Sequence, residues 1–354
     1  MEATELGALD GAREERVPLR SSIVELRGAD GSILAGDDPL LGRLANPIVA
    51  HDVYGELARL LAMGDDEVES PEAAYLCAAA SAWAPAGSAS LLRALQHLGL
   101  GSKGRCSVVA VRNPALDLDV EVMCVVNPRD DVGLVVLRGP EVPVGLRWLR
   151  QPVALAPMPD GRGYVHARFL EVLSPLWDGL TELTRSREMS GRRLLFTGYG
   201  FGGVLALLAS ARLVATRQLS SADRRRPSLQ GIHTFGQPRV GDAAFATWAE
   251  ERVGERHYRY VADADLLCDL PWPWFGLHHA GRECRLQSGR WRFVRTGPAG
   301  NMAALGRLGR YTLRAVTERL GSDRNRHPGH DSHCGIAKYL RVSRQAVNRA
   351  LLFP

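Results

Sequence analysis

The sequence predicts an α/β fold in which a mostly parallel central sheet is covered by helices on both faces. Short apolar runs bounded by turn residues alternate with helical segments after residue 104, and this alternation is typical of parallel sheets. Within residues 192–210 an apolar β run meets a glycine-rich corner and continues as an apolar helix. The chain has 354 residues, of which 45% are hydrophobic, so it can bury a sizeable core.

The part of the chain ahead of this sheet is predicted to be an extension. Residues 1–45 are rich in glycine and aspartate and are expected to form a flexible segment or a hairpin. Residues 46–104 show helical spacing, and Ser70 followed by Pro71 has the form of an N-cap with proline at the first helical position. We therefore divide the chain into an N-terminal segment, a helical extension and an α/β domain that comprises residues 105–354.

Strands and helices of the α/β domain are expected wherever apolar runs of the matching period end at turn residues. The predicted strands occupy residues 106–114, 120–128, 132–140, 194–196 and 257–265, and a further apolar stretch covers residues 231–242. Helices are predicted over residues 166–186 and 204–208.

The corner within residues 198–203 reads Gly-Tyr-Gly-Phe-Gly-Gly, which predicts a tight turn between a strand and a helix. In many hydrolases a serine stands at the centre of such a turn, because the strained backbone pushes its hydroxyl out at the edge of the sheet. Here the central residue is Gly200. The turn has the small residues and the apolar helix that this geometry needs, but it has no side chain at its centre.

Several stretches of the chain together resemble the class 3 lipase family, the fungal-type triacylglycerol lipases. The family's elbow, T-G-H-S-L-G-G-A-L-A, resembles residues 197–206, and its T-F-G-x-P-R-V-G-N resembles residues 234–242. Further stretches resemble F-R-G-T, V-H-x-G-F, D-x-V-P-x-L-P and h-x-G-x-E of the family, in residues 137–140, 165–169, 265–271 and 275–283. The stretches follow the family's order over about residues 105–340.

The resemblance implies an α/β-hydrolase fold and the residues of a serine–histidine–aspartate triad. Gly200 stands at the nucleophile position, and Asp265 stands at the position of the acid. The resemblance places the base just ahead of the last helix, where His333 is our first choice and His330 the alternative. The implied substrates are lipids or other acyl esters.

The oxyanion hole implied by the resemblance would use the backbone N–H of Phe201 and the residue at position 140. The family has threonine or serine there, whose N–H and hydroxyl help to bind the oxyanion. Pro140 has neither group. Because Gly200 also lacks a nucleophilic oxygen, we expect a degenerate site in a pseudoenzyme that binds an acyl ligand or a protein partner. The alternative is an active lipase or carboxylic ester hydrolase whose serine has been exchanged for Gly200 in this chain.

Residues 335–351 support a different hypothesis, a DNA-associated regulator. They resemble a helix-turn-helix with its turn at Val342 and Ser343, and the arginine-rich C-terminal part of the chain would suit a nucleic acid. However, Arg341 stands where such turns usually have glycine, and the same residues also form the expected last helix of the lipase-like domain. We therefore favour the lipase-like interpretation and do not expect nucleic acid as a partner.

The remaining features of the sequence concern cofactors, location and one aromatic cluster. Six cysteines lie far apart without a C-x-x-C pair, so we expect no metal, no other cofactor and reduced thiols. The start of the chain is acidic without an apolar region, and no apolar run reaches the ~18 residues that span a bilayer, which predicts a cytoplasmic protein without a transmembrane segment. The aromatic residues 272–275 either line an acyl site or form a covered loop.

Overall fold

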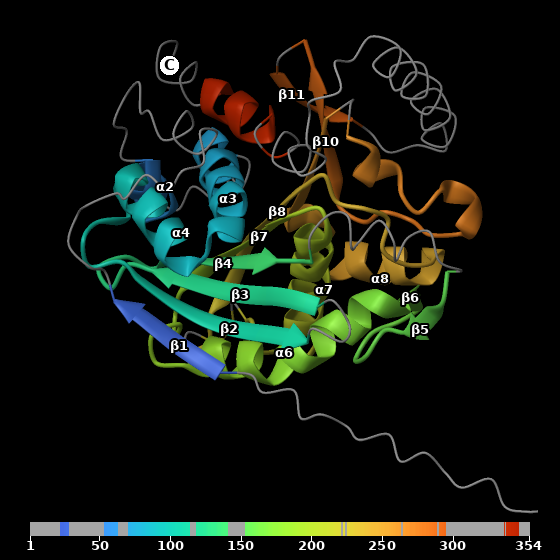
Figure 1. Ribbon diagram of the computed structural model, residues 1–354, viewed down its shortest axis with the longest axis horizontal. Helices are drawn as coiled ribbons and strands as arrows, with labels where there is room; N and C mark the ends of the chain where they lie inside the picture. Colours follow the sequence, from blue (N-terminus) through green and yellow to red (C-terminus); the bar gives the residue numbers. More distant parts are fainter. Residues whose placement is uncertain are drawn as a thin grey trace, which may run out of the picture.

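The computed structural model (Figure 1) describes residues 22–27, 53–62, 70–113, 118–140, 153–220, 222–223, 225–262, 265–288, 290–294, 336 and 338–346. Its main feature is a nine-stranded sheet with the strand order β1-β2-β3-β4-β7-β8-β9-β10-β11. These strands are β1 (Ser22–Arg27), β2 (Arg105–Asn113), β3 (Leu118–Val126), β4 (Val132–Arg138), β7 (Arg193–Tyr199), β8 (Ser228–Phe235), β9 (His257–Val261), β10 (Arg282–Gln287) and β11 (Arg290–Val294). A separate two-stranded sheet pairs β5 (Leu155–Pro157) with β6 (Tyr164–His166).

The central strands β4, β7, β8, β9 and β10 are parallel, and the strands on both flanks are antiparallel. Strand β9 is buried along its whole length, and β8 is buried in all but its first residue. Such continuous burial is expected for parallel strands that are covered on both faces. The α/β fold with a parallel central sheet is confirmed.

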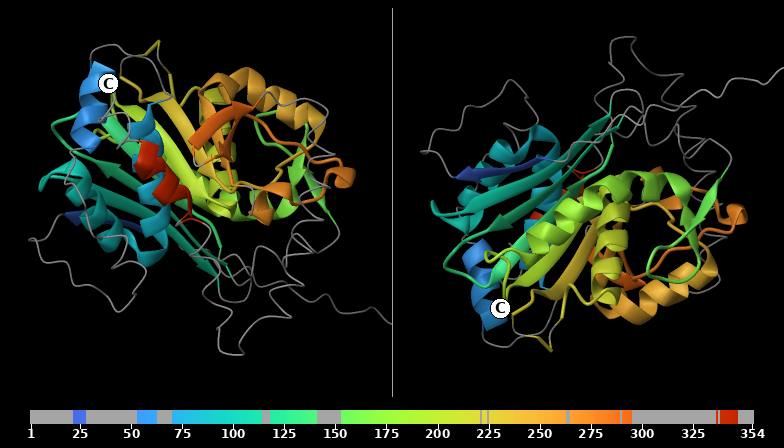
Figure 2. Two further views of the ribbon diagram at one scale, coloured as in Figure 1. Left: turned by 90° about the horizontal axis from the view of Figure 1, so that it is seen from above. Right: turned by 90° about the horizontal axis from the view of Figure 1, so that it is seen from below.

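Two layers of helices cover the two faces of the sheet, as Figure 2 shows. The helices α6 (Ala167–Arg185), α7 (Phe201–Ala215) and α8 (Ala243–Val253) pack into one hydrophobic core. On the other face, α2 (Val53–Ala62), α3 (Pro71–Trp83) and α4 (Ser88–Leu95) share a second core with the helical residues near the C-terminus. Short helical turns complete the fold: η1 (Ala84–Ala86), η2 (Gln96–Leu100), η4 (Gly254–Arg256), η5 (Leu266–Asp269) and η6 (Pro273–Phe275).

Helix α3 begins where the sequence predicts. The Ser70 Oγ accepts a hydrogen bond from the Ala73 N–H at 3.0 Å, and proline occupies the first turn. Almost every residue of α3 is buried, and its Ser81 hydroxyl lies 2.9 Å from the Thr197 hydroxyl of β7. The helix therefore packs directly on the central strand of the sheet.

Two segments ahead of residue 105 are integrated into this architecture. Strand β1, from the expected segment 1–45, pairs antiparallel with β2, with Ser22 opposite Ala110. The helices of the expected extension 46–104 pack against the sheet face. The other residues of segment 1–45 lie outside the described residues, so the boundaries at residues 45 and 104 stay predictions.

The described residues of the C-terminal segment are helical where a helix-turn-helix would require a turn. Residue 336 and residues 338–346 are helical, without a break at Val342 and Ser343, where the DNA-binding hypothesis requires a turn. The Ser343 side chain is buried and accepts a hydrogen bond from the Trp291 indole N–H at 3.1 Å. The expected turn is therefore not found at these two residues, which are buried in the fold, and the expectation about nucleic acid stays a prediction.

The five cysteines in the described ranges are buried and free of disulfides, and burial raises the pKa of the Cys106 thiol to about 12. None of the helices that the structure describes is both long and apolar enough to cross a bilayer. The cytoplasmic location stays a prediction.

Candidate active site

The predicted strand–turn–helix lies at the carboxyl end of the central strand β7. Parallel α/β sheets place their ligand sites at this edge. Gly200 separates β7 from α7 with φ 55° and ψ −117°, a backbone conformation that residues other than glycine adopt only with strain. Its N–H donates to the Phe235 carbonyl of β8 at 2.8 Å. The chain therefore keeps the sharp elbow although the central side chain is missing.

Two glycines next to the elbow are required by close approach of the backbone. A Cβ on Gly202 would overlap the carbonyl oxygen of Leu137 at the end of β4. A Cβ on Gly198 would overlap the backbone of Gly202. The first turn of α7 is thus pressed against both β4 and β7, which fixes the helix N-terminus at the sheet edge.

The elbow has room for a small side chain at position 200. A Cβ built on Gly200 would lie 3.3 Å from its nearest neighbour, the Cδ1 atom of Leu267. That contact is slightly tight, but it involves the end of a flexible side chain and no backbone atom. A serine could therefore occupy this position after a small movement of Leu267, apart from the backbone strain.

The segment after β4 lies against the start of α7, as the lipase resemblance implies. A Cβ on Gly139 would be only 2.6 Å from the Gly202 nitrogen and 2.8 Å from the Phe201 Cβ. The next residue, Pro140, is buried. Because the proline nitrogen bears no hydrogen, this residue cannot donate a backbone hydrogen bond at the elbow.

Asp265 lies beside the elbow, four residues beyond the end of β9. One of its carboxylate oxygens accepts the Leu267 N–H at 3.0 Å, and the other accepts the Tyr339 hydroxyl at 2.9 Å. The hydroxyl of Tyr199, the residue directly before Gly200, also hydrogen-bonds the carboxylate. Asp265 packs on Gly236, where a Cβ would overlap the carboxylate and where φ is 63°. The structure therefore brings Gly200, Phe201, Pro140 and Asp265 to one corner of the sheet.

Burial raises the pKa of the Asp265 carboxyl from 3.8 to about 6. The hydrogen bonds from Tyr339 and from the Leu267 N–H oppose this rise, and the negative charge of Asp269 adds to it. The same surroundings raise the pKa of Tyr339 well above its usual value, mainly through burial. Tyr339 is fully buried, whereas Asp265 is partly exposed.

This shift predicts how stability depends on pH. Because the folded pKa of Asp265 lies above the unfolded value, its protonated form contributes stability at low pH that is lost as the pH rises through about 6. Urea unfolding at several pH values should therefore show wild type losing about 2–3 kcal/mol more than Asp265→Asn between pH 4 and pH 7.5. Parallel curves for the two proteins would contradict this assignment.

Sequence reasoning missed the two tyrosines that bind Asp265. Tyr339 accepts the Ala262 N–H at 3.0 Å while it donates to Asp265, so its hydroxyl joins the C-terminal helix to the end of β9. Its ring stacks with Trp291 at a centroid distance of 5.8 Å. The sequence marks Tyr199 as unusual, because it stands where the family's elbow has the histidine that precedes the serine.

The expected base cannot be placed. His333 and His330 both lie outside the described residues, and His327 does as well. Their contact with Asp265 stays a prediction. Tyr339, which hydrogen-bonds Asp265, lies in the described helical residues that follow this segment in the sequence.

The remaining histidine of the resemblance, His166, has a structural role. It caps α6, because its Nδ1 accepts the Arg168 N–H at 3.3 Å. Burial is the main cause that lowers its pKa to about 4, so the ring is neutral at physiological pH.

The aromatic residues 272–275 are not a covered loop, since Trp274 is 60% exposed and Phe275 46% exposed.

In the described part of the chain, no group of three or more histidine, cysteine or carboxylate side chains is placed to hold a metal ion.

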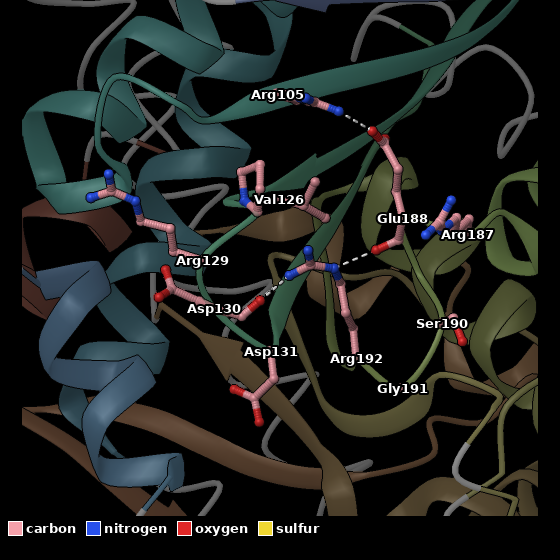
Figure 3. A pocket seen from close by; sticks show the side chains of 11 residues that line it. Arg105, Val126, Arg129, Asp130, Asp131, Arg187, Glu188, Ser190, Gly191 and Arg192 are labelled. Atoms are coloured by element: carbon pink, nitrogen blue, oxygen red, sulfur yellow. Dashed lines mark hydrogen bonds and ion pairs between the residues drawn. The ribbon is translucent and has the colours of Figure 1, made fainter.

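A pocket of about 570 Å³ lies at the opposite edge of the sheet, near the starts of β4 and β7 (Figure 3). There the Arg192 guanidinium donates to the carbonyls of Asn127, at 3.0 Å, Asp130 and Glu188. Arg192 is thus bound by backbone carbonyls, while Arg105 pairs with the Glu188 carboxylate.

The central part of the chain is similar to known lipases. Residues 143–274 match the family model of class 3 lipases. A lipase of Rhizomucor miehei is 33% identical over 135 residues, which are 37% of this chain and 35% of the relative. The triacylglycerol lipase OBL1 of Nicotiana tabacum is 34% identical over 89 residues, which are 24% of this chain and 15% of the relative. The matches thus span about a third or less of these curated relatives.

Solved structures agree with the fold. The crystal structure of a lipase from Rhizopus microsporus var. chinensis superposes with a TM-score of 0.51 at 18% sequence identity. The superposition covers 64% of this chain and 77% of that lipase. The chain has the α/β-hydrolase fold, and the sequence matches support the class 3 lipase family for its central part.

Proposed function

We propose that this chain is a lipase-like domain that holds an acyl chain or ester at the elbow without cleaving it through a serine. The observation that carries the proposal is Gly200, which keeps the backbone of a nucleophile elbow and supplies no oxygen. Similarity to class 3 lipases supports a lipid or acyl ester as the ligand. A protein that docks in the same corner is the alternative occupant.

The chemistry of acyl transfer explains why such a site would not turn over. A serine hydroxyl attacks the ester carbonyl, passes its proton to a histidine, and leaves an oxyanion that backbone N–H groups stabilise. Gly200 removes the attacking atom, so no acyl-enzyme can form at this position. Pro140 removes a donor from the expected oxyanion hole, and loss of one such donor typically costs about 2.7–4 kcal/mol of transition-state stabilisation. We assign to the backbone N–H of Phe201 the role of donating to the carbonyl oxygen of a bound ester.

The role that we assign to Asp265 is structural in the present protein. In a triad this carboxylate would orient the histidine base. Here both oxygens already accept hydrogen bonds, from the Leu267 N–H and the Tyr339 hydroxyl. A carboxylate has about four acceptor positions, so a histidine from the preceding segment can still join. We assign this position to His333, with His330 as the alternative.

The second candidate is a lipase or other ester hydrolase that is active with serine at position 200, where this chain has Gly200. One observation favours it: the nearest atom to a Cβ at position 200 is the flexible end of Leu267. The site has therefore kept room for the original side chain. This candidate predicts that a serine at position 200 restores activity by itself.

Wild-type protein should hydrolyse p-nitrophenyl butyrate at the rate of buffer alone, because the nucleophile is missing. Initial rates over a range of protein concentrations measure this directly. The control is Asp265→Asn, which should give the same background rate. Turnover that rises with protein concentration and disappears in His333→Ala would overturn the proposal, since it would show a working base and another nucleophile.

A further inference from the structure

The pocket at the edge of the sheet opposite the elbow lies between two turns. One turn, residues 127–131, joins β3 to β4, and the other, residues 186–192, joins α6 to β7. The Arg192 guanidinium connects the turns, because it donates to the Asn127 carbonyl of the first, at 3.0 Å, and to the Glu188 carbonyl of the second. The two walls of the pocket are therefore fixed relative to each other.

Hydrogen bonds within each turn hold its backbone in place. In the first turn the Arg129 N–H donates to the Asn127 side-chain oxygen at 3.1 Å. In the second turn the Met189 N–H donates to the Ser186 carbonyl at 3.1 Å, and Arg187 lies between these two residues in the sequence. The side chains of Arg129 and Arg187, which both line the pocket, thus extend from well-fixed backbone on its two walls.

Positive charge is in excess at this pocket. Each of its three carboxylates has a partner: Glu188 pairs with Arg105, Asp131 pairs with Arg193 at 2.8 Å, and Asp130 accepts the Asn127 side-chain N–H at 2.8 Å. Within the part of the chain that the structure describes, no carboxylate pairs with the exposed Arg129 or Arg187. Including Arg193, the site has five guanidinium groups and three carboxylates, which leaves a net charge of +2 that attracts anions.

The two unpaired guanidinium groups are set apart. They come from different turns, and Figure 3 shows Arg129 and Arg187 on opposite sides of Arg192. A guanidinium can bind a phosphate group through two parallel hydrogen bonds, and this planar fork gives phosphate a defined orientation. Two such groups on opposite walls suit a ligand that has a phosphate at each end.

The rest of the lining suits a ligand whose body is rich in hydroxyl groups. The described lining residues include no aromatic ring on which a nucleobase could stack. Asp130, Asp131 and Glu188 keep free acceptor positions for sugar hydroxyls, because a carboxylate has about four of them. The volume of about 570 Å³ lies within the range of small-molecule sites.

We propose that this pocket binds a sugar or polyol that carries a phosphate group at each end, with one phosphate on Arg129 and the other on Arg187. Arg192 stays on the carbonyls of the two turns and adds its positive charge to the site. The carboxylates accept hydroxyl groups of the ligand. This site goes beyond the proposed function, because it lies at the opposite edge of the sheet from Gly200 and needs no acyl ligand.

Isothermal titration calorimetry tests this site, with fructose 1,6-bisphosphate as the probe and the full chain in a buffer free of phosphate and sulfate. Fructose 6-phosphate lacks the second phosphate, and ADP carries both of its phosphates at one end. We expect the bisphosphate to bind at least tenfold more tightly than either. Arg129→Gln and Arg187→Gln should each bind the bisphosphate at least fivefold more weakly than wild type, and the double variant should lose detectable binding.

The matched control is Arg162→Gln/Arg292→Gln. Arg162 and Arg292 are exposed and do not belong to the pocket lining, so this variant loses the same charge as Arg129→Gln/Arg187→Gln at other places. It should bind the bisphosphate within twofold of wild type. Because all four arginines are exposed, both double variants should keep the urea midpoint of wild type, which separates a lost contact from lost folding.

Three results would overturn the proposal. One is the absence of bisphosphate binding by wild type, and another is equal binding by Arg129→Gln/Arg187→Gln. The third is equal or tighter binding of fructose 6-phosphate or ADP, which would show that the ligand is not held at two ends. None of these measurements involves the elbow or ester hydrolysis, so their outcome is independent of the proposed function.

Discussion

Gly200→Ser alone is expected to hydrolyse p-nitrophenyl butyrate slowly, and adding Pro140→Thr is expected to raise kcat/KM by about 10²- to 10³-fold. The serine supplies the attacking oxygen, and its Cβ has room beside Leu267. The threonine supplies a backbone N–H and a hydroxyl where proline has neither. The backbone at φ 55° strains a serine, which we expect to lower stability by about 1–3 kcal/mol.

Matched variants separate the two missing groups. Gly200→Ala carries the same backbone strain without an oxygen, so it should be as inactive as wild type alone or with Pro140→Thr. Full activity of Gly200→Ser by itself would show that Pro140 is harmless, and would favour the active hydrolase with an exchanged serine. No activity in the double variant would contradict the assigned site.

The same double variant identifies the base. Adding His333→Ala should return hydrolysis to the background rate, because the serine would then have no group to take its proton. Adding His330→Ala should leave the rate within a few-fold. The opposite pattern would assign the base to His330, and two unaffected rates would exclude both histidines.

Gly202→Ala is expected to be strongly destabilising. Its Cβ would overlap the Leu137 carbonyl, which belongs to the backbone of β4 and cannot turn aside. Overpacking of this kind costs about 1–3 kcal/mol or more, and here we expect at least the upper value. The neighbour Gly203→Ala is the control, because its Cβ would approach no described atom closer than 3.1 Å. Urea unfolding of both variants should separate them, and equal midpoints would contradict the tight contact of α7 with β4.

Local sequence patterns were enough to predict the centre of the fold. Apolar runs that end at glycine or proline gave β2, β3, β4, β7 and β8, because each is buried and bounded by strong turn residues. The pairing of β1 with β2 could not be predicted, since register between distant strands depends on packing and not on local pattern. Helix α8 was missed although Asp242 caps it by accepting the Phe245 N–H at 2.7 Å.

The sequence motifs predict only those parts of the candidate site that lie within them. The positions of Gly200 and Asp265 follow from motifs that end central strands, because such ends meet at one edge of a parallel sheet. The hydrogen bonds of Tyr339 and Tyr199 to Asp265 were not predictable, because they depend on how the C-terminal helix docks. The exposure of Trp274 likewise reflects the way η6 projects from the fold, which composition does not encode.

The central claim, that the elbow at residue 200 has lost only its nucleophile and the oxyanion donor, is tested most directly by covalent labelling. Wild type, Gly200→Ala and Gly200→Ser/Pro140→Thr are incubated with an alkyl fluorophosphonate, and intact mass and peptide mapping locate any adduct. The account predicts one adduct, on the serine introduced at position 200, and none on wild type or Gly200→Ala. An adduct on wild type, or a double variant that is folded and unlabelled, would contradict it.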